Sequence, residues 1–365
     1  MAGTAMVILL AALVLGGAGW FVYRRRDTAP PPQALGIRPP PAGAMPPGSS
    51  ARIIGGRRVP AGQLADGRIA VSGLTKEYGG LRAVDGLSFA AEPGRVTGFL
   101  GPNGAGKTTT LRMLLGLVEP TAGTATVGGR RYADLDQPIR RVGGQLEAAA
   151  AHKGRTGRSH LRIICQSAGI PLPRADEVLD LAGLTAAGDR AFRGYSLGMR
   201  QRLGVAAALI GDPQVLILDE PTNGLDPEGI RWMRELLRAL AAHGRTILVA
   251  SHFLAEMQLL ADDVIIVADG RLVTQGSVTA IVGSLAHGRR TLVRTPEVDK
   301  LIAVLGDDVI AAPAGSGEVY ITGADAVAIG DAAQLAGIAV HQLVTEHPDL
   351  EAAYLELTAG KAAIR

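Results

Sequence analysis

The stretch that decides the fold consists of Gly101, Pro102, Asn103, Gly104, Ala105, Gly106, Lys107, Thr108 and Thr109. Its spacing is that of a phosphate-binding loop, G-x-x-x-x-G-K-[ST]. The apolar run Arg95–Leu100 before it suits a buried strand, and residues 109–118 have the apolar spacing of a helix. Because a strand, a glycine loop and a helix in this order aim backbone N–H groups and a helix N-terminus at one point, they predict a site for an anion.

The loop assigns roles to two of its side chains. Lys107 is expected to reach the β- and γ-phosphates of a nucleotide, and the Thr108 hydroxyl is expected to ligate Mg²⁺. An ordinary glycine-rich turn is the alternative. The Lys-Thr pair in register and the strand before the loop argue against that alternative.

Composition sets wide limits on the class of protein. A chain of 365 residues has room for one large domain and smaller pieces, and a net charge of +3 implies no broad basic face. The one cysteine, Cys165, cannot form a disulfide within the chain. The folded part therefore fits a reducing cytosol.

The N-terminal part divides into two predicted segments. Ala5–Tyr23 is almost wholly apolar, and its length of ~19 residues is enough to cross a bilayer as a helix. The cluster Arg24–Arg26 follows at once, which places that end in the cytoplasm and the N-terminus outside. We expect residues 1–26 to be a transmembrane anchor at the cell membrane. The proline-rich residues 27–67 read as an extended, disordered linker.

The pattern changes to alternating strands and helices over residues 68–284. Ile69–Leu74, Gly86–Ala90 and residues 123–129 suit strands, and residues 159–188 suit helix broken at two prolines. Three continuous apolar runs suit strands buried on both faces: Gln214–Leu218, Thr246–Ala250 and Asp263–Val267. A helix is expected over Glu228–His243, between the first two runs. This alternation predicts an α/β fold with a parallel sheet whose ligands bind at the carboxyl ends of its strands.

The tail, residues 285–365, has its own order of elements. The expected strands are 291–294, 309–312, 318–322 and 339–344, and the expected helices are 298–305, 324–336 and 350–357. The order βαββαβ with one further helix matches a ferredoxin-like α+β unit. Because the tail contains no chemical motif, we interpret it as a packing or dimerisation module.

Two acidic residues, Asp219 and Glu220, follow the strand 214–218. An aspartate at the end of such a strand can hold Mg²⁺ opposite Thr108. Glu220 is placed to accept a proton from, or to orient, the water that attacks the γ-phosphate. Taken alone, the pair could equally be two solvated acids at a strand end.

Three further motifs remove that ambiguity. They are Tyr195–Arg202 (YSLGMRQR), Asp219–Asp226 (DEPTNGLD) and Ser251-His252. With the phosphate loop they give four motifs in the order of the ATP-binding cassette family, and residues 69–284 resemble the nucleotide-binding subunits of ABC transporters. The Ser-Leu-Gly-Met form of the motif at Tyr195–Arg202 and the added C-terminal domain resemble those of one branch of the family. This branch is the bacterial drug and antibiotic exporters related to bacitracin and daunorubicin resistance.

The resemblance implies a fold and a role for further residues. The fold is a P-loop cassette with a mostly parallel core sheet, an antiparallel β subdomain and a helical subdomain. Tyr78 would stack on adenine, and Ser196 and Gly198 would touch the γ-phosphate held by a second subunit. Asp226 would contact that subunit, and His252 would hydrogen-bond the γ-phosphate and steady the attacking water.

One position departs from the family pattern. The family usually carries a glutamine that senses Mg²⁺ and the transporter partner. Counted from Arg141, the corresponding position in this chain is Glu147. A carboxylate is at least as good a Mg²⁺ ligand, so Glu147 is the first choice. Gln145, two residues earlier, is the alternative.

The resemblance implies an ATPase subunit of an exporter. Two copies of the cassette would form a homodimer around two ATP molecules with Mg²⁺, and a separate multi-span permease in the membrane would form the pore. No nucleic acid partner is implied. A non-transport ABC-type ATPase acting on a macromolecular partner is the alternative, although such relatives carry two cassettes or long coiled coils. A GTPase lacks support because residues 223–226 do not form an Asn-Lys-x-Asp signature.

Overall fold

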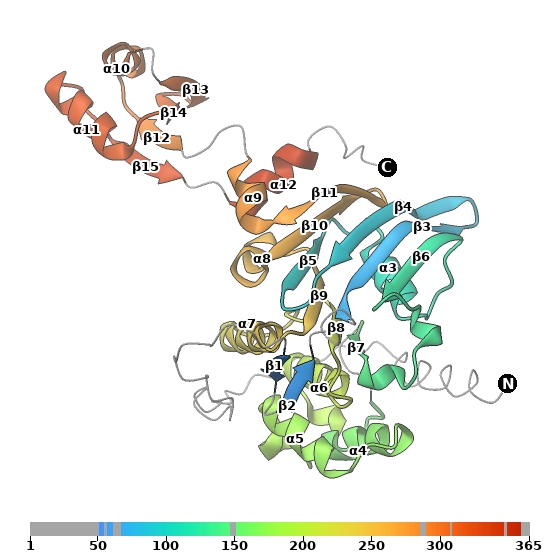
Figure 1. Cartoon of the computed structure of the whole chain (residues 1–365). Coiled ribbons are helices and arrows are strands. Elements are labelled where there is room, and N and C mark those ends of the chain that lie inside the picture. Colours follow the sequence, from blue (N-terminus) through green and yellow to red (C-terminus); the bar gives the residue numbers. More distant parts are fainter. Residues whose placement is uncertain are drawn as a thin grey trace. The chain divides into compact units, whose positions relative to one another are not determined.

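The computed structural model describes residues 51–54, 57–60, 67–146, 151–284, 290–306, 309–346 and 349–358. Figure 1 traces the whole chain. The chain divides into two compact units. The large unit consists of the described residues up to Phe253 and of Leu259–Gln275, and the small unit consists of Leu254–Gln258 and the described residues from Gly276 onward.

The centre of the large unit is a six-stranded sheet in the order β11-β10-β5-β9-β8-β7. The strands are β11 (Arg271–Ser277), β10 (Asp263–Ala268), β5 (Val96–Leu100), β9 (Thr246–Ser251), β8 (Val215–Asp219) and β7 (Val142–Gln145). The pairs from β10 through β5, β9 and β8 to β7 are all parallel. Strands β5, β8 and β9 are buried at every residue, which explains their continuous apolar sequences. Their carboxyl ends therefore meet at one edge of the sheet.

A second, antiparallel sheet has the order β4-β3-β6. Its strands are β3 (Ile69–Tyr78), β4 (Leu81–Ala91) and β6 (Ala122–Val127). Tyr78 pairs with Leu81 across the turn Gly79-Gly80. Both glycines have positive φ, 54° and 87°, which a two-residue hairpin turn of this kind requires.

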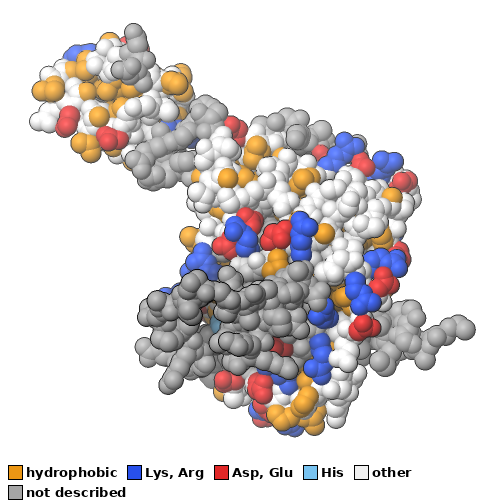
Figure 2. Space-filling model, viewed as in Figure 1, with side chains coloured by type: hydrophobic (Ala, Val, Ile, Leu, Met, Phe, Trp, Pro, Cys, Tyr) orange, Lys and Arg blue, Asp and Glu red, His pale blue; other side chains and the backbone are white. Residues whose placement is uncertain are grey.

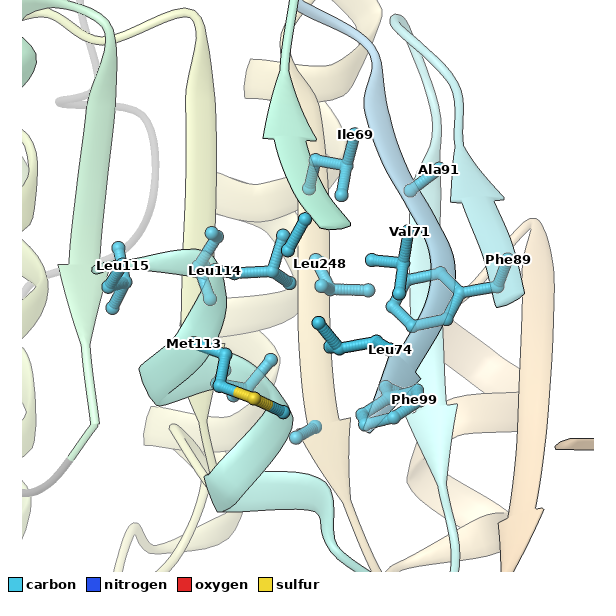
Figure 3. Packing of buried hydrophobic residues seen from close by; sticks show 14 of the residues in the cluster. Ile69, Val71, Leu74, Phe89, Ala91, Phe99, Met113, Leu114, Leu115 and Leu248 are labelled. Carbon is cyan, nitrogen blue, oxygen red and sulfur yellow. The ribbon is translucent and has the colours of Figure 1, made fainter. Parts of the chain in front are cut away.

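The helix α3 (Lys107–Leu114) and the strands of both sheets share one hydrophobic core. Figure 3 shows Met113 and Leu114 of this helix beside Leu74 and Leu248. The rings of Phe89 and Phe99 pack with their centroids 5.2 Å apart. This packing fixes the first turn of α3, and with it the loop that precedes the helix.

The remaining helices of the large unit come largely from its middle. They are α4 (Gly157–Ser167), α5 (Pro173–Leu181), α6 (Leu197–Ala208) and α7 (Pro227–Ala242), with α8 (Leu254–Leu260) shared between the units. Single-turn 3₁₀ helices lie at Tyr132–Asp134, Pro138–Arg140, Thr185–Ala187 and Phe192–Gly194. The helical stretch expected over 159–188 is two helices, and Pro173 occupies the first position of α5, where its missing N–H costs nothing.

The small unit contains α9 (Val278–Gly283) and a sheet in the order β13-β14-β12-β15. Its other elements are β12 (Arg290–Arg294), α10 (Val298–Leu305), β13 (Ile310–Gly315), β14 (Glu318–Thr322), α11 (Ala326–Leu335), β15 (Gln342–Glu346) and α12 (Leu350–Thr358). All neighbouring strands are antiparallel. Val293, Leu301 and Ile329 are among the buried residues that give this unit its own core.

Strand β7 and a hairpin in the N-terminal part differ from the sequence expectations. Strand β7 was not expected, because Gly143 and Gly144 have low strand propensity. The packing explains both glycines, since a Cβ at Gly143 would lie 2.1 Å from the Ala208 carbonyl oxygen and one at Gly144 would lie 2.8 Å from Leu115 Cδ1. Within the expected linker, β1 (Ala51–Ile54) pairs antiparallel with β2 (Arg57–Pro60). The prolines of the linker lie mostly before this hairpin, and Ile and Val favour strands.

The predicted anchor, residues 1–26, lies outside the described residues. Over the ranges that the structure does describe, every helix is too short or too polar to span a bilayer. On the face of the molecule in Figure 2, acidic and basic side chains are interspersed over the large unit.

Candidate functional site

The carboxyl ends of β5, β8 and β9 bring together the phosphate loop, the Asp219-Glu220 pair and the Ser251-His252 pair. β5 leads into the loop at Gly101, β8 ends at Asp219 and β9 ends at Ser251. Parallel pairing puts these three ends side by side. Residues that lie far apart in sequence are thereby gathered at one edge of the sheet.

The phosphate loop depends on glycine at two points. Gly104 and Gly106 have φ of 84° and 89°, which L side chains rarely adopt. A Cβ at Gly106 would also lie 2.4 Å from the Ala83 carbonyl oxygen. The Ala105 N–H closes the loop by donating to the Pro102 carbonyl oxygen at 3.2 Å, while Asn103 is exposed and Thr109 lies in the first turn of α3.

Lys107 is the buried cation of the loop. Its Nζ donates to the carbonyl oxygens of Gly101 at 2.6 Å and Pro102 at 3.2 Å. Burial lowers the pKa of this amine, and the charges of Glu220 and Asp219 oppose that shift. An ammonium group held inside a loop of backbone N–H groups is suited to neutralising a bound phosphate.

Thr108 and Asp219 form a pair of oxygen donors. The Thr108 Oγ1 donates to Asp219 Oδ2 at 2.6 Å. Burial raises the pKa of the Asp219 carboxyl, the Thr108 hydrogen bond opposes that rise, and the Glu220 charge adds to it. A hydroxyl and a carboxylate side by side are the oxygen ligands that Mg²⁺ prefers, so these residues fit such an ion.

Glu220 is held by its neighbours on β9. Its backbone has φ of 47°, an uncommon value for a residue with a side chain, and its N–H donates to the Ala250 carbonyl oxygen at 2.9 Å. Its Oε1 lies 2.7 Å from His252 Nδ1, and Ser251 Oγ donates to its Oε2 at 3.4 Å. The carboxylate is thus fixed at the sheet edge where the phosphate loop begins.

Ser196, Gly198 and Asp226 lie on other elements. Ser196 is the N-cap of α6, since its Oγ accepts from the Met199 N–H at 3.2 Å. A Cβ at Gly198 would lie 3.4 Å from the Gly224 carbonyl oxygen, so this glycine faces the loop that ends in Asp226. Asp226 itself caps α7, where its Oδ1 accepts from the Gly229 N–H at 2.8 Å.

Tyr78 ends β3 with its side chain half exposed, and the Lys76 ammonium lies 5.0 Å from the centre of its ring. The ring is free enough to stack on a planar group. Its role stays a prediction.

The two candidates for the Mg²⁺-sensing position have different standings. Glu147 lies outside the described residues. Gln145 is buried, and its Nε2 donates to Gln201 Oε1. Both assignments therefore stay predictions.

Two residues near Glu220 were given no role by the sequence reasoning. Ser251 is fully buried and contacts the Glu220 carboxylate directly. Gln201 reaches the turn after Glu220 from α6. Ser251 could have been found from its place beside His252, but nothing in the sequence pairs Gln201 with Glu220.

The arrangement combines an anion-binding loop, a pair of ligands for a divalent cation and a carboxylate hydrogen-bonded to an imidazole. A carboxylate of this kind can accept a proton from water. The loop and the cation would stabilise charge on a phosphoryl group. These are the parts needed to hydrolyse a nucleoside triphosphate.

Comparison with known families matches two parts of the chain. Residues 84–223 match the family described as ABC transporter. Residues 289–351 match a domain of unknown function (DUF8746).

Curated relatives agree with the first match. The bacitracin transport ATP-binding protein BcrA of Bacillus licheniformis is 44% identical over 210 residues, which cover 57% of this chain and 69% of that protein. The daunorubicin/doxorubicin resistance ATP-binding protein DrrA of Streptomyces peucetius is 41% identical over 224 residues, which cover 60% of this chain and 67% of that protein.

Solved structures show the same fold. An ATP-binding subunit of an ABC transporter superposes with a TM-score of 0.54 at 28% identity, covering 58% of this chain and 91% of that one. A dimeric, post-hydrolysis ATP-binding cassette bound to ADP and Pi superposes with a TM-score of 0.53 at 22% identity, covering 57% of this chain and 98% of that one.

Proposed function

The chain belongs to the ABC transporter ATP-binding family, and from that premise we propose that it is the ATP-hydrolysing subunit of an exporter of antibiotic-like or drug-like compounds. The observation that supports this most directly is the juxtaposition at one sheet edge of Lys107, the Thr108–Asp219 pair and the Glu220–His252 pair. The names of the relatives BcrA and DrrA support the cargo class.

In this proposal the described residues have separate roles in ATP binding and hydrolysis. Gly101–Thr109 bind the phosphates, and Lys107 supplies the positive charge. Thr108 and Asp219 would hold Mg²⁺, which lends charge stabilisation to the phosphates when bound. Glu220 accepts the proton of the attacking water, and His252 positions the carboxylate through their hydrogen bond. Tyr78 stacks on the adenine.

A second copy of the chain completes the site. The N-terminus of α6 presents the Ser196 hydroxyl and backbone N–H groups, which is a second place for an anion. In the proposed homodimer each ATP lies between the phosphate loop of one copy and Ser196 and Gly198 of the other, with Asp226 at the contact. ATP binding closes the dimer and hydrolysis reopens it, which moves a separate multi-span permease between two states.

The small unit and the N-terminal segment complete the proposal for the whole chain. The sheet order β13-β14-β12-β15, with antiparallel neighbours, supports a ferredoxin-like fold for the small unit. Residues 1–26 would anchor the chain at the cytoplasmic face of the cell membrane, beside the permease.

The test is a pair of variants measured for both nucleotide binding and phosphate release. Glu220→Gln keeps the shape of the side chain but removes the proton acceptor, so it should bind ATP normally and hydrolyse it at least ~10²-fold more slowly. Lys107→Ala removes the buried cation and should abolish binding.

The paired readout separates the two roles. Turnover of Glu220→Gln equal to that of the unchanged protein would remove Glu220 from its proposed role. Unchanged nucleotide affinity in Lys107→Ala would show that the phosphate loop does not bind the nucleotide as proposed. An alanine at the exposed Lys300 of the small unit is the control for loss of a lysine.

A further inference from the structure

A buried pair of amides connects the end of β7 to the turn that carries Glu220. Gln145 and Gln201 are both at most 5% exposed. Gln145 Nε2 donates to Gln201 Oε1. Gln201 Nε2 in turn donates to the carbonyl oxygens of Asn223 at 3.2 Å and Glu220 at 3.4 Å.

The turn that receives these hydrogen bonds is conformationally demanding. Glu220 has φ of 47°, which a residue with a side chain adopts only when its surroundings hold it there. Its carbonyl oxygen also accepts from the Asn223 N–H at 3.1 Å. The Gln201 amide therefore clamps both ends of the four-residue turn that begins at the proposed proton acceptor.

The orientation of the Gln201 amide follows from Gln145. If Gln201 were turned over, its oxygen would face the two carbonyl oxygens of the turn, and three acceptor oxygens would meet without a hydrogen between them. Gln145 favours the observed orientation because it offers an N–H to the Gln201 oxygen. Gly204 leaves room for this, since a Cβ there would lie 3.0 Å from Gln145 Cδ.

The arrangement has a feature that stability alone does not favour. Among the described residues no group donates to Gln145 Oε1, although this atom is buried. Two apolar side chains of the same size would avoid that unpaired acceptor. A pair of amides is instead kept at the back of the Glu220 turn.

We propose that Gln201 is a positioning residue for Glu220, and that Gln145 fixes the orientation of the Gln201 amide. The inference rests on the proposed function, because it assumes that Glu220 takes part in hydrolysis. It assigns to Gln201 the task of holding the Glu220 backbone, and therefore the carboxylate, where Ser251 and His252 contact it.

The first measurement is steady-state ATP hydrolysis by Gln201→Met, a side chain of similar length without an amide. The rate kcat should fall at least tenfold while KM for ATP changes less than twofold. The reason is that, within the described residues, Gln201 hydrogen-bonds Gln145 and the Glu220 turn but not the phosphate loop. Gln145→Leu should lower kcat by a smaller factor. An unchanged kcat in both variants would overturn the proposal.

A pH series distinguishes hydrogen bonding from packing. In Gln201→Glu the buried carboxylate has no hydrogen to donate, but its protonated form has one. The rate relative to the unchanged protein should therefore rise at least threefold as the pH falls from 8 to 6, whereas the relative rate of Gln201→Met should stay level. Level profiles for both variants would contradict a donor role.

The closing experiment places Gln201→Met in the Glu220→Gln background and measures the residual single-turnover rate. If Gln201 acts through Glu220, the second substitution should change that rate less than twofold. A further fall equal to the one in the unchanged background would overturn the proposal. Failure of the proposed function would appear separately, as full activity of Glu220→Gln alone.

Discussion

The two acids that follow each other at the end of β8 occupy different environments. Asp219 is buried and accepts from Thr108, whereas Glu220 is partly exposed and lies against Ser251 and His252. The first environment suits a ligand that needs a cation beside it, and the second suits a group that exchanges a proton with water. Two consecutive residues thus have different chemical roles. The left-handed backbone conformation of Glu220 lets the two side chains enter different environments.

Asp219 is expected to cost stability in the absence of nucleotide and metal. Burial raises the pKa of its carboxyl above the usual 3.8. A raised pKa of an acid means that the folded chain holds its proton more tightly, so the contribution to stability is present at low pH and is lost as the pH rises through the folded pKa. Asp219→Asn keeps an acceptor for Thr108 and should raise the melting temperature at pH 7.5 by a few degrees.

The difference should shrink as the pH is lowered from 7.5, because the unchanged carboxyl takes up a proton as the pH approaches its raised pKa. Differential scanning fluorimetry without nucleotide is the measurement. A lower melting temperature for Asp219→Asn at pH 7.5 would show that the charge is stabilising. Asp263→Asn, at the partly buried start of β10, is a control for loss of an aspartate from the same sheet, and it should lower the melting temperature because Asp263 pairs with Arg95.

At the scale of an element, α6 has a capping residue with two separable tasks. The Ser196 hydroxyl caps the helix in this single chain, and in the proposed dimer it also contacts an anion. Ser196→Asp should keep the cap, since aspartate is as good an N-cap as serine and its charge suits a helix N-terminus.

The same aspartate would repel a bound phosphate. We therefore expect an unchanged melting temperature for Ser196→Asp and a fall in hydrolysis of about 10²-fold. The matched control is Asp325→Ser, the reverse exchange at the N-cap of α11 in the small unit, which should leave hydrolysis unchanged. Full activity of Ser196→Asp would mean that this hydroxyl serves only as a helix cap.

Elements differ in how far the sequence predicts them. Strands such as β8 and β9 could be predicted because they are buried on both faces and must be apolar throughout. Strand β7 could not be predicted, because its two glycines are required by close contacts with Ala208 and Leu115. Only the folded chain brings these residues near.

The site divides in the same way. Lys107, Asp219 and Glu220 belong to local motifs, and they lie close together in the structure. Gln145 and Gln201 are 56 residues apart and make a tertiary hydrogen bond that no local spacing encodes. Sequence reasoning therefore finds the groups that would touch the nucleotide more readily than those that hold them in place.

At the scale of the whole molecule, the small unit has a core of its own, with Leu301 fully buried in it. Leu301→Ala should destabilise this unit by about 2–5 kcal/mol. Calorimetry of the full chain should show one transition that this substitution lowers and another that Mg²⁺ and ATP raise, because ligand binding stabilises only the unit that binds it.

The control for that substitution is Leu335→Ala, which removes a side chain that is 89% exposed and should change neither transition. A single transition that moves with both Leu301→Ala and ATP would show that the two units unfold as one.

The central claim is that two copies of the chain share each ATP. The most direct test is the mass in solution, by size exclusion with light scattering, of the Glu220→Gln variant in saturating ATP and Mg²⁺. The account predicts a dimer that reverts to a monomer without nucleotide, and a monomer under both conditions when Ser196→Asp is added. A variant that binds ATP and stays monomeric, or one that dimerises equally well with Ser196→Asp, would contradict it.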